Sequence, residues 1–234
     1  MSDLNNYFVA KIESKSVKPW LLKKHYARRM PTIQFAFGLF NKSGDSVISQ
    51  MFGVADLKGV ITFGPPAGYR AAFACVPDDL TKYVYELNRL CINSDVPKNA
   101  ASFFVSRALK MLPENSIILS YSDIGQGHIG YIYQATNWIY TGITDQTGCY
   151  SKIDVGEKVT KTSKSFYSKL GTASKSVILE HYPDAKFFAR SQKHRYVFFT
   201  NKKHKKFLKY KIMAYPKGES KRYECKDIIN NMVK

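Results

Sequence analysis

At 234 residues the chain is long enough to bury one sizeable hydrophobic core. Hydrophobic residues make up 44% of it and aromatic residues 14%, which excludes an intrinsically disordered chain. No apolar run reaches the roughly 20 residues of a membrane span and the first residues contain no signal-peptide core, so we expect a cytoplasmic protein with no membrane partner. Cys75, Cys91, Cys149 and Cys225 lie far apart, a spacing that favours free thiols over a zinc site.

The positive charge is unevenly distributed along the chain. The formal net charge is +18, and residues 151–234 hold 21 Lys and Arg against 7 Asp and Glu, whereas residues 1–150 hold 15 against 11. A basic surface concentrated in one third of a chain is typical of a protein with a polyanionic partner. A solvated basic face is the plainer alternative. An anionic membrane is less favoured, because the basic run "NKKHKKFLKYK" is short and has no amphipathic stripe.

The first two thirds of the chain alternate between strand and helix patterns. Apolar stretches bounded by turn residues predict strands at residues 32–40, 46–54, 58–64 and 116–120. Apolar residues at helical spacing predict a helix that follows the loop at residues 93–99 and stops at Pro113. Residues 83–92 fit either a helix or a strand, and residues 127–137 form a second helix or a long turn before "WIYTG".

The pattern changes after about residue 150. Residues 151–165 are polar and rich in lysine, like a linker, and residues 165–183 read as two short helical segments about Gly171. "HRYVFFT" predicts a strand again. We therefore expect an α/β (α+β) chain with a core at 1–150, a basic, partly helical insertion at 151–193, the final strands at 194–216 and a peripheral tail at 217–234.

Several sequence blocks, taken in order, resemble a known family. "LNRLCI", "FFVSRAL", "SYSD" and "YQATNW" resemble the second half of the GNAT acyltransferase fold, in which a splayed strand precedes a phosphate-binding loop and helix. With "HYARRMP", "FGPPAG", the block "GHIGYIYQATNWIYTG" and "KHRYVFFT", the chain looks more specifically like the Mom DNA-modification proteins of phages over most of residues 20–216. The resemblance implies a GNAT-like mixed central sheet flanked by helices, and it favours a strand at residues 83–92.

The resemblance also implies an activity. Mom proteins are enzymes that add a carbamoylmethyl group to the exocyclic amino nitrogen of adenine in phage DNA and so protect the genome from host restriction. The partners implied are double-stranded DNA in the host cytoplasm and a small-molecule group donor, either acetyl-CoA or another acyl or glycyl donor. A GNAT-type acetyltransferase acting on protein or RNA amines, or a non-catalytic basic DNA-binding protein, remains an alternative. The oligomeric state is not predicted.

Two candidate elements lie at ends of predicted strands. The cofactor-binding loop of the GNAT pattern falls on five consecutive residues before and within the predicted helix, Lys98, Asn99, Ala100, Ala101 and Ser102, although the glycines of that pattern are missing. Asp123 follows the strand 116–120, where α/β sheets place their chemistry. A turn-capping aspartate is the alternative there, because glycines follow. The resemblance assigns Asp123 to accept a proton or hydrogen bond from the adenine amino group.

Four further residues complete the expected chemistry. The resemblance assigns the pair His25 and Tyr26 to base recognition, proton transfer or metal ligation, and Tyr133 to proton donation to the leaving group, with core packing as the alternative for Tyr133. His25, Asp123 and His128 are candidate ligands for iron or another divalent metal, a weak prediction because the spacing is not distinctive.

Lysines of the basic third are the candidate DNA contacts. They occur in the predicted insertion and in the run after the last predicted strand, at Lys164, Lys169, Lys175, Lys202, Lys203, Lys205 and Lys206. Such residues contact phosphates and position a protein on the duplex without reading its sequence.

Overall fold

The computed structural model describes residues 4–25, 27–42, 55–145, 150–156 and 163–219. Its strands are β1 (Tyr7–Lys11), β2 (Phe35–Asn41), β3 (Asp56–Gly64), β4 (Val84–Ile92), β5 (Ile117–Asp123), β6 (Ile139–Ile143), β7 (Tyr150–Asp154), β8 (Lys186–Ala189) and β9 (Lys193–Phe199). Its α-helices are α1 (Ser14–Pro19), α3 (Tyr69–Cys75), α4 (Ala100–Lys110), α5 (Tyr131–Ala135), α6 (Ser163–Leu170) and α7 (Lys175–His181). Short 3₁₀ or π-helical turns are η1 (Leu4–Asn6), η2 (Trp20–Lys24), η3 (Asp78–Tyr83), η4 (Ile124–Gln126) and η5 (Lys202–Phe207).

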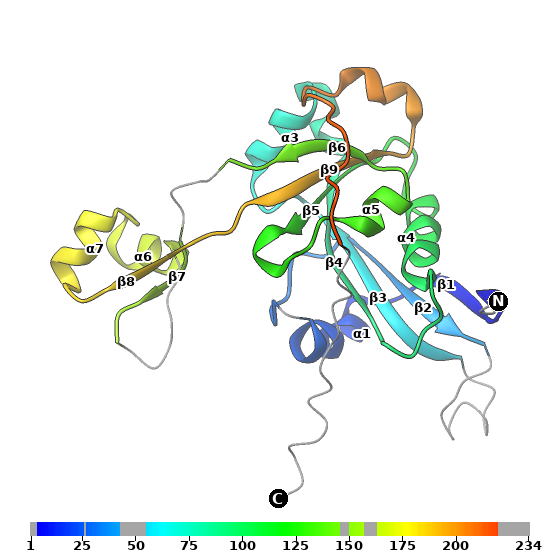
Figure 1. The fold of residues 1–234 in the computed structure, drawn as a ribbon, viewed down its shortest axis with the longest axis horizontal. Coiled ribbons are helices and arrows are strands. Elements are labelled where there is room, and N and C mark those ends of the chain that lie inside the picture. The colour runs from blue at the N-terminus through cyan, green and yellow to red at the C-terminus, as the bar shows by residue number, and fades with distance from the viewer. Residues whose placement is uncertain (1–3, 26, 43–54, 146–149, 157–162, 220–234) are drawn as a thin grey trace, which may run out of the picture.

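A mixed sheet forms the centre of the molecule (Figure 1). In the described part of the chain its strand order is β1-β2-β3-β4-β5-β9-β6, and neighbours are antiparallel except β4 and β5. The predicted mixed sheet flanked by helices, with a helical insertion before the last strand of the sheet, is confirmed. None of the helices in the described ranges is long and apolar enough to cross a membrane.

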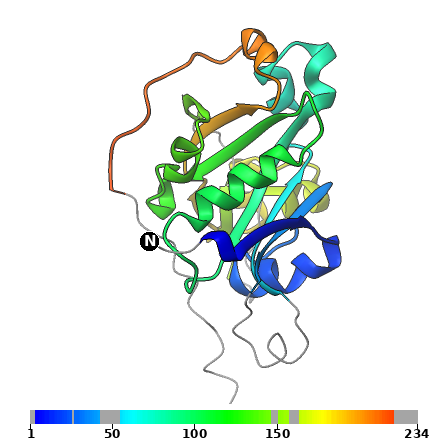
Figure 2. The ribbon, with the colours of Figure 1, turned by 90° about the vertical axis from the view of Figure 1, so that its right-hand side faces the viewer.

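Alternation along the strands builds a core on each face of the sheet. Ile118 packs with Phe104 and Ala108 of α4 and Tyr133 of α5 on one face. Figure 2 shows α4 lying across this face of the sheet. Its neighbours Ile117 and Leu119 pack with α3 on the other face. The helix α1 and η2 cover that second face farther along, over β2, β3 and β4. Because α4 and α3 lie on opposite faces, side chains of a central strand reach two separate environments.

Most predicted elements are present with small changes in their bounds. Residues 83–92 form a strand, as the resemblance favoured, and β5 continues through Asp123 rather than ending at Ser120. The two helical segments are α6 and α7, with Gly171 between them at φ +69°. The strand predicted at 46–54 lies outside the described residues, as do positions 220–234 of the predicted tail.

The predicted linker at 151–165 is wrong at its start, because residues 150–154 form β7. In β7 Ile153 is fully buried while its neighbours are more exposed, an alternation that the lysines hid in the sequence. β7 pairs with β8, which the sequence did not predict, and these two strands with α6 and α7 form a small lobe around Ile153, Phe166 and Ile178. We call residues 150–190 the lobe; it lies at one end of the molecule in Figure 1.

The strands β4 and β5 diverge after a short parallel ladder. Only three residue pairs, from Val84 with Ile117 to Glu86 with Leu119, are in register. Beyond them β4 continues to Ile92 beside β3, and β5 continues to Asp123 beside β9. A fork therefore opens in the middle of the sheet, and its walls carry backbone groups that no neighbouring strand occupies.

Candidate active site

A cavity of about 580 Å³ fills the fork, a size typical of sites for small ligands. One wall is β4 from Leu87 to Ile92 with the loop that follows it. The other is the end of β5, Tyr121–Asp123, with residues 128–135 of the next loop and α5. The cavity therefore lies at the carboxyl ends of two parallel strands, the place where α/β sheets bind ligands.

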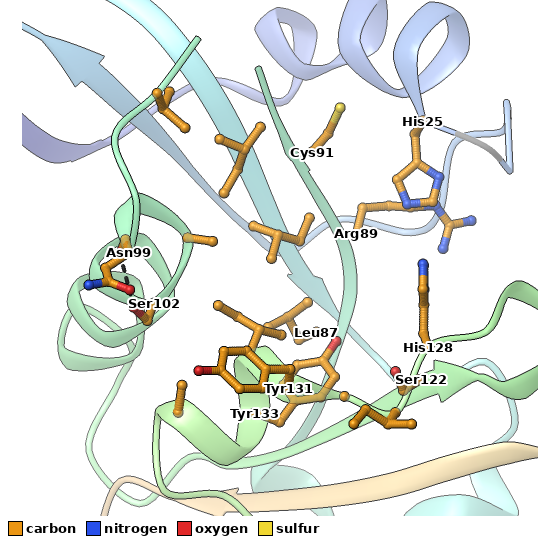
Figure 3. Close-up of a pocket in the computed structure, with 18 of the residues that line it drawn as sticks. His25, Leu87, Arg89, Cys91, Asn99, Ser102, Ser122, His128, Tyr131 and Tyr133 are labelled. Carbon is orange, nitrogen blue, oxygen red and sulfur yellow. Dashed lines mark hydrogen bonds between the residues drawn. The ribbon is translucent and has the colours of Figure 1, made fainter. Parts of the chain in front are cut away.

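The loop between β4 and α4 supplies one end of the cavity (Figure 3). Lys98, Asn99, Ala101 and Ser102 line it, whereas Ala100 is fully buried in the core. Asn99 takes a left-handed conformation, φ +70°, and the Ser102 hydroxyl donates to its carbonyl oxygen at 2.9 Å. The N-terminus of an 11-residue helix thus opens on the cavity, with the small Ala101 and the cation of Lys98 beside it. This end has the partial positive charge that attracts phosphate groups.

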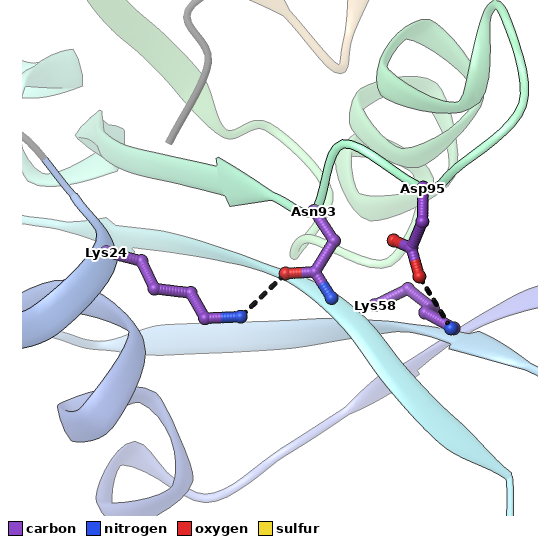
Figure 4. Close-up of polar contacts among 4 residues, drawn as sticks. All are labelled: Lys24, Lys58, Asn93 and Asp95. Carbon is purple, nitrogen blue, oxygen red and sulfur yellow. Dashed lines mark hydrogen bonds and ion pairs between the residues drawn. The ribbon is translucent and has the colours of Figure 1, made fainter. Parts of the chain in front are cut away.

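Two lysines from neighbouring elements hold this loop in place (Figure 4). The Lys24 ammonium donates to the side-chain oxygen of Asn93 at 2.8 Å, and Lys58 forms an ion pair with Asp95 at 2.9 Å. The Lys58 side chain is only 8% exposed, so its charge depends strongly on this partner. The loop is also anchored by Val96, which is buried in the core. These contacts fix the position of the α4 N-terminus relative to the fork.

Asp123 lines the opposite wall of the cavity. The amide of Gly125 donates to its Oδ1 at 2.9 Å, and the Ser191 hydroxyl donates to the same oxygen. The aspartate therefore does cap the turn η4, as the alternative reading held. Both bonds fall on Oδ1, however, so Oδ2 keeps its lone pairs for a ligand. Capping and a role in the cavity are compatible because a carboxylate has two oxygens.

His25, Arg89 and His128 group at the other end of the cavity (Figure 3). The His25 side chain is buried, and its Nδ1 accepts a hydrogen bond from the Ala27 amide at 3.0 Å. Burial, with a smaller contribution from the Arg89 charge, lowers the pKa of His25 to about 4. His25 is therefore a neutral imidazole near pH 7, and the bond at Nδ1 places its proton on Nε2. Tyr26, the predicted partner of His25, lies outside the described residues.

The predicted metal site is not supported by this arrangement. Within the parts of the chain that the structure describes, no three His, Cys, Asp or Glu side chains lie close enough to hold a metal ion together. His25, Asp123 and His128 line one cavity without forming a ligand set.

Tyr133 lies where β4 and β5 separate. Its ring is buried against Trp138 and Tyr196, so the predicted packing role is present. Its hydroxyl oxygen is 2.8 Å from Ser120 Oγ, which is itself 3.1 Å from the Leu87 carbonyl oxygen at the end of the parallel ladder. Since Tyr133 also lines the cavity, its hydroxyl can exchange a proton with a ligand there while Ser120 fixes its position.

The predicted DNA-contacting lysines fall into two separated groups. Lys169 and Lys175 are exposed on the lobe; Lys164 belongs to α6, but its side chain is outside the description. Lys202, Lys203, Lys205 and Lys206 are exposed on η5. The register of β5 with β9 pairs Asp123 with Lys193, next to the lobe, and Ile117 with Phe199, next to η5. The lobe and η5 therefore adjoin opposite ends of the β5–β9 pair. At roughly 3.3 Å per residue these two ends are about 20 Å apart.

Further residues line the site beside the candidates named above. Asn88, Arg89, Tyr121 and Ser122 line the cavity, and Tyr131 is 60% exposed at its rim. Burial raises the pKa of Tyr121, so its hydroxyl is a neutral donor at physiological pH. "LNRLCI" and "SYSD" contain the first four, but which of them face the fork depends on where the two strands part, and no sequence pattern gives that point.

Comparison with known proteins decides the family. A model of the Mom protein family matches residues 6–217, nine tenths of the chain. The chain belongs to the Mom protein family. One relative in it is the methylcarbamoylase Mom of Escherichia phage Mu, which is 26% identical over 224 residues, covering 90% of this chain and 86% of the relative.

Solved structures that align with this Mom family member are acetyltransferases. A spermidine N-acetyltransferase from Vibrio cholerae aligns over 85% of this chain and 96% of its own, with 9% identity and a TM-score of 0.46. An N-acetyltransferase from Staphylococcus aureus aligns over 84% and 99%, with 13% identity and a TM-score of 0.44.

Proposed function

We propose that this protein is a DNA-modifying transferase that adds a carbamoylmethyl group to the exocyclic amino group of adenine. The observation that carries the proposal is membership of the Mom family over residues 6–217, with a relative named as a methylcarbamoylase. For a phage-encoded enzyme the substrate is phage DNA in the host cytoplasm, and the modification protects it from restriction. The forked cavity supports this assignment because it joins two chemically different ends: a helix N-terminus on one side, and Asp123 with His25 on the other.

The acceptor base binds at the Asp123 end. An adenine inside a duplex is not accessible, so the enzyme must extrude it, at an unstacking cost of about a few kcal/mol. The amino nitrogen is a poor nucleophile because its lone pair is delocalised into the ring. Oδ2 of Asp123 accepts a hydrogen bond from this amino group and takes its proton as the new N–C bond forms. The neutral His25 donates from Nε2 to a ring nitrogen, and the exposed ring of Tyr131 offers a stacking surface.

The group donor binds at the α4 end. Phosphates of a coenzyme A thioester fit the amide groups at the α4 N-terminus and the Lys98 cation, and Ala101 permits close approach of the backbone. Ser102 is less suited, because its hydroxyl turns back to Asn99. Tyr133 protonates the leaving group, held in position by Ser120. Acyl transfer alone gives an amide, whereas a carbamoylmethyl group is attached through a methylene carbon, so a donor that presents an electrophilic CH₂ group, such as a glycine derivative, fits the product better than acetyl-CoA.

Mass spectrometry of nucleosides tests the proposal. DNA from cells expressing the chain is expected to contain deoxyadenosine heavier by one carbamoylmethyl group. Asp123→Asn keeps the side-chain volume but removes the base, and should reduce the modified nucleoside by at least about 100-fold. Asp79→Asn, an exposed aspartate of η3, is the matched control and should change nothing. Unmodified adenine with acetylated protein or RNA would instead favour the acetyltransferase alternative. Unmodified nucleic acid and protein would favour a binding protein.

A further inference from the structure

The root of the lobe is fixed beside the cavity. On one side the Thr144 amide donates to the Lys193 carbonyl at 2.8 Å, and the Lys193 amide donates to Thr144 Oγ1 at 3.1 Å, so the two strands that connect to the lobe are held together. On the other side the Ile124 amide donates to the carbonyl of Gln192 at 3.2 Å, and Ser191 contacts Asp123. The chain therefore passes from the lobe directly along the wall that carries the candidate base.

The lobe combines a small hydrophobic core with exposed cations. The side chains of Lys169, Lys175, Lys186 and Arg190 are exposed, and we call these four the lobe cations. Three fully buried side chains, Ile153, Phe166 and Ile178, form the centre of its core. Over residues 150–193 the sequence has nine Lys and Arg against four Asp and Glu. Such a surface is suited to bind a polyanion that reaches the cavity from this side.

We infer that double-stranded DNA docks on the lobe, with the lobe cations contacting phosphates next to the extruded nucleotide, and that η5 is not part of this contact. The inference rests on the proposed function, because it takes the substrate to be a base extruded from a duplex. The phosphates next to such a base remain at the mouth of the cavity, where the lobe is rooted. The segment η5 follows the sheet at the opposite end of the β5–β9 pair. Its lysines are closer together in sequence than the lobe cations, but they lie at the end away from Asp123.

The chain provides its own matched control. The lobe variant replaces Lys169, Lys175, Lys186 and Arg190 with Gln, and the η5 variant replaces Lys202, Lys203, Lys205 and Lys206 with Gln. Each removes four exposed positive charges, so the two variants have the same net charge. Any difference between them in DNA binding therefore reflects where the charges lie. Circular dichroism melting of both full-length variants checks that each is folded.

The measurement is a fluorescence titration of a 30-base-pair labelled duplex, repeated over a series of salt concentrations. Each lost phosphate contact should reduce the slope of log Kobs against log salt by about 0.9. For the lobe variant we expect affinity at least about 10-fold weaker at moderate salt and a slope reduced by about 2 to 4. For the η5 variant we expect a slope within about one unit of the parent's slope. A lobe variant with the parent's affinity and slope would overturn the inference. So would an η5 variant that loses as much as the lobe variant, or a parent chain that does not bind the duplex.

This result is separable from the proposed chemistry. Binding is measured without a group donor, so the lobe can dock DNA even if nucleoside analysis finds no modified adenine, in which case only the proposed function fails. Conversely, the lobe variant could bind DNA like the parent and produce the parent's level of modified adenine in cells. That result would overturn the docking inference and leave the proposed function in place.

Discussion

The two ends of β5 use the same kinds of residue for different purposes. At the Ile117 end, polar groups bond to one another: Asn201 donates to Asn115 at 2.8 Å, and the Thr200 amide donates to the Ser116 carbonyl at 3.0 Å. At the Asp123 end, polar side chains face a cavity because β4 no longer pairs with β5 there. The most basic segment, η5, follows the closed end. Charge density alone therefore points to the Ile117 end of the strand, whereas the cavity lies at the Asp123 end.

The largest expected effect is a lower free energy of unfolding in acid, caused by His25 in the cavity. Burial holds the folded-state pKa of His25 near 4, below the ordinary value of 6.5. As the pH falls, the unfolded chain therefore binds a proton at His25 at a higher pH than the folded chain does. The stabilisation is complete above pH 6.5 and is lost as the pH falls toward 4, amounting to about 3 kcal/mol. Urea unfolding at several pH values should show this loss in the parent and not in His25→Gln. Equal acid sensitivity in both chains would mean that His25 is not buried in its neutral form.

The next effect is on turnover and compares two buried tyrosines on one face of the sheet. Tyr133→Phe removes the hydroxyl at the fork and should slow modification by about 100-fold, equivalent to about 2.7 kcal/mol, with the fold kept. Tyr140→Phe removes a hydroxyl of similar burial that bonds to His194 at 2.8 Å, away from the cavity. Single-turnover rates of the two variants check this prediction. If Tyr133→Phe does not slow the reaction, Tyr133 acts through packing alone, because phenylalanine keeps the ring; equal slowing by both variants would mean a general effect of losing a buried hydroxyl.

A smaller effect concerns the loop that presents the α4 N-terminus. Asp95→Ala removes the Asp95 carboxylate from the buried Lys58 ammonium and should reduce the free energy of unfolding by about 2 kcal/mol. The comparison variant is Glu13→Ala, whose partner Lys15 is 82% exposed and whose loss should cost less than about 0.5 kcal/mol. Denaturant titration measures both, and similar values for the two would show that Lys58 is solvated in solution.

The smallest predicted effect lies at the junction of the lobe and the site. Ser191→Ala removes one of the two donors to Oδ1 of Asp123, so the carboxylate is positioned less well and modification should slow by about 10-fold. DNA affinity should be unchanged, because Ser191 carries no charge. Kinetics with saturating DNA separate the two quantities. Weaker DNA binding at an unchanged rate would instead make Ser191 part of the docking surface.

The sequence predicts local elements well where one residue pattern dominates. The helix α4 follows from apolar residues at helical spacing and from Pro113, and Asp123 stands out because a carboxylate ends an apolar strand. The resemblance decides β4, which periodicity leaves open. By contrast, β7 is hidden because Ile153 is its one buried residue and Ser151, Lys152 and Asp154 around it are polar, and β8 because it is only four residues long and largely exposed.

Contacts between distant segments cannot be predicted in this way. Ser191 reaches Asp123 across 68 residues only because β9 runs antiparallel to β5. The same pairing separates the lobe cations from η5, although both groups lie in one basic third of the sequence. Arg89 enters the site because β4 and β5 stop pairing after Glu86. Each of these facts depends on the direction and register of paired strands, which the residue pattern within one strand does not specify.

A crystal structure of the full chain bound to a duplex that it modifies tests the central claim most directly. We predict an adenine rotated out of the duplex, its amino nitrogen within hydrogen-bond distance of Asp123 and the flanking phosphates against the lobe. A base still stacked in the helix, or a duplex lying against η5 with the fork empty, would contradict the account.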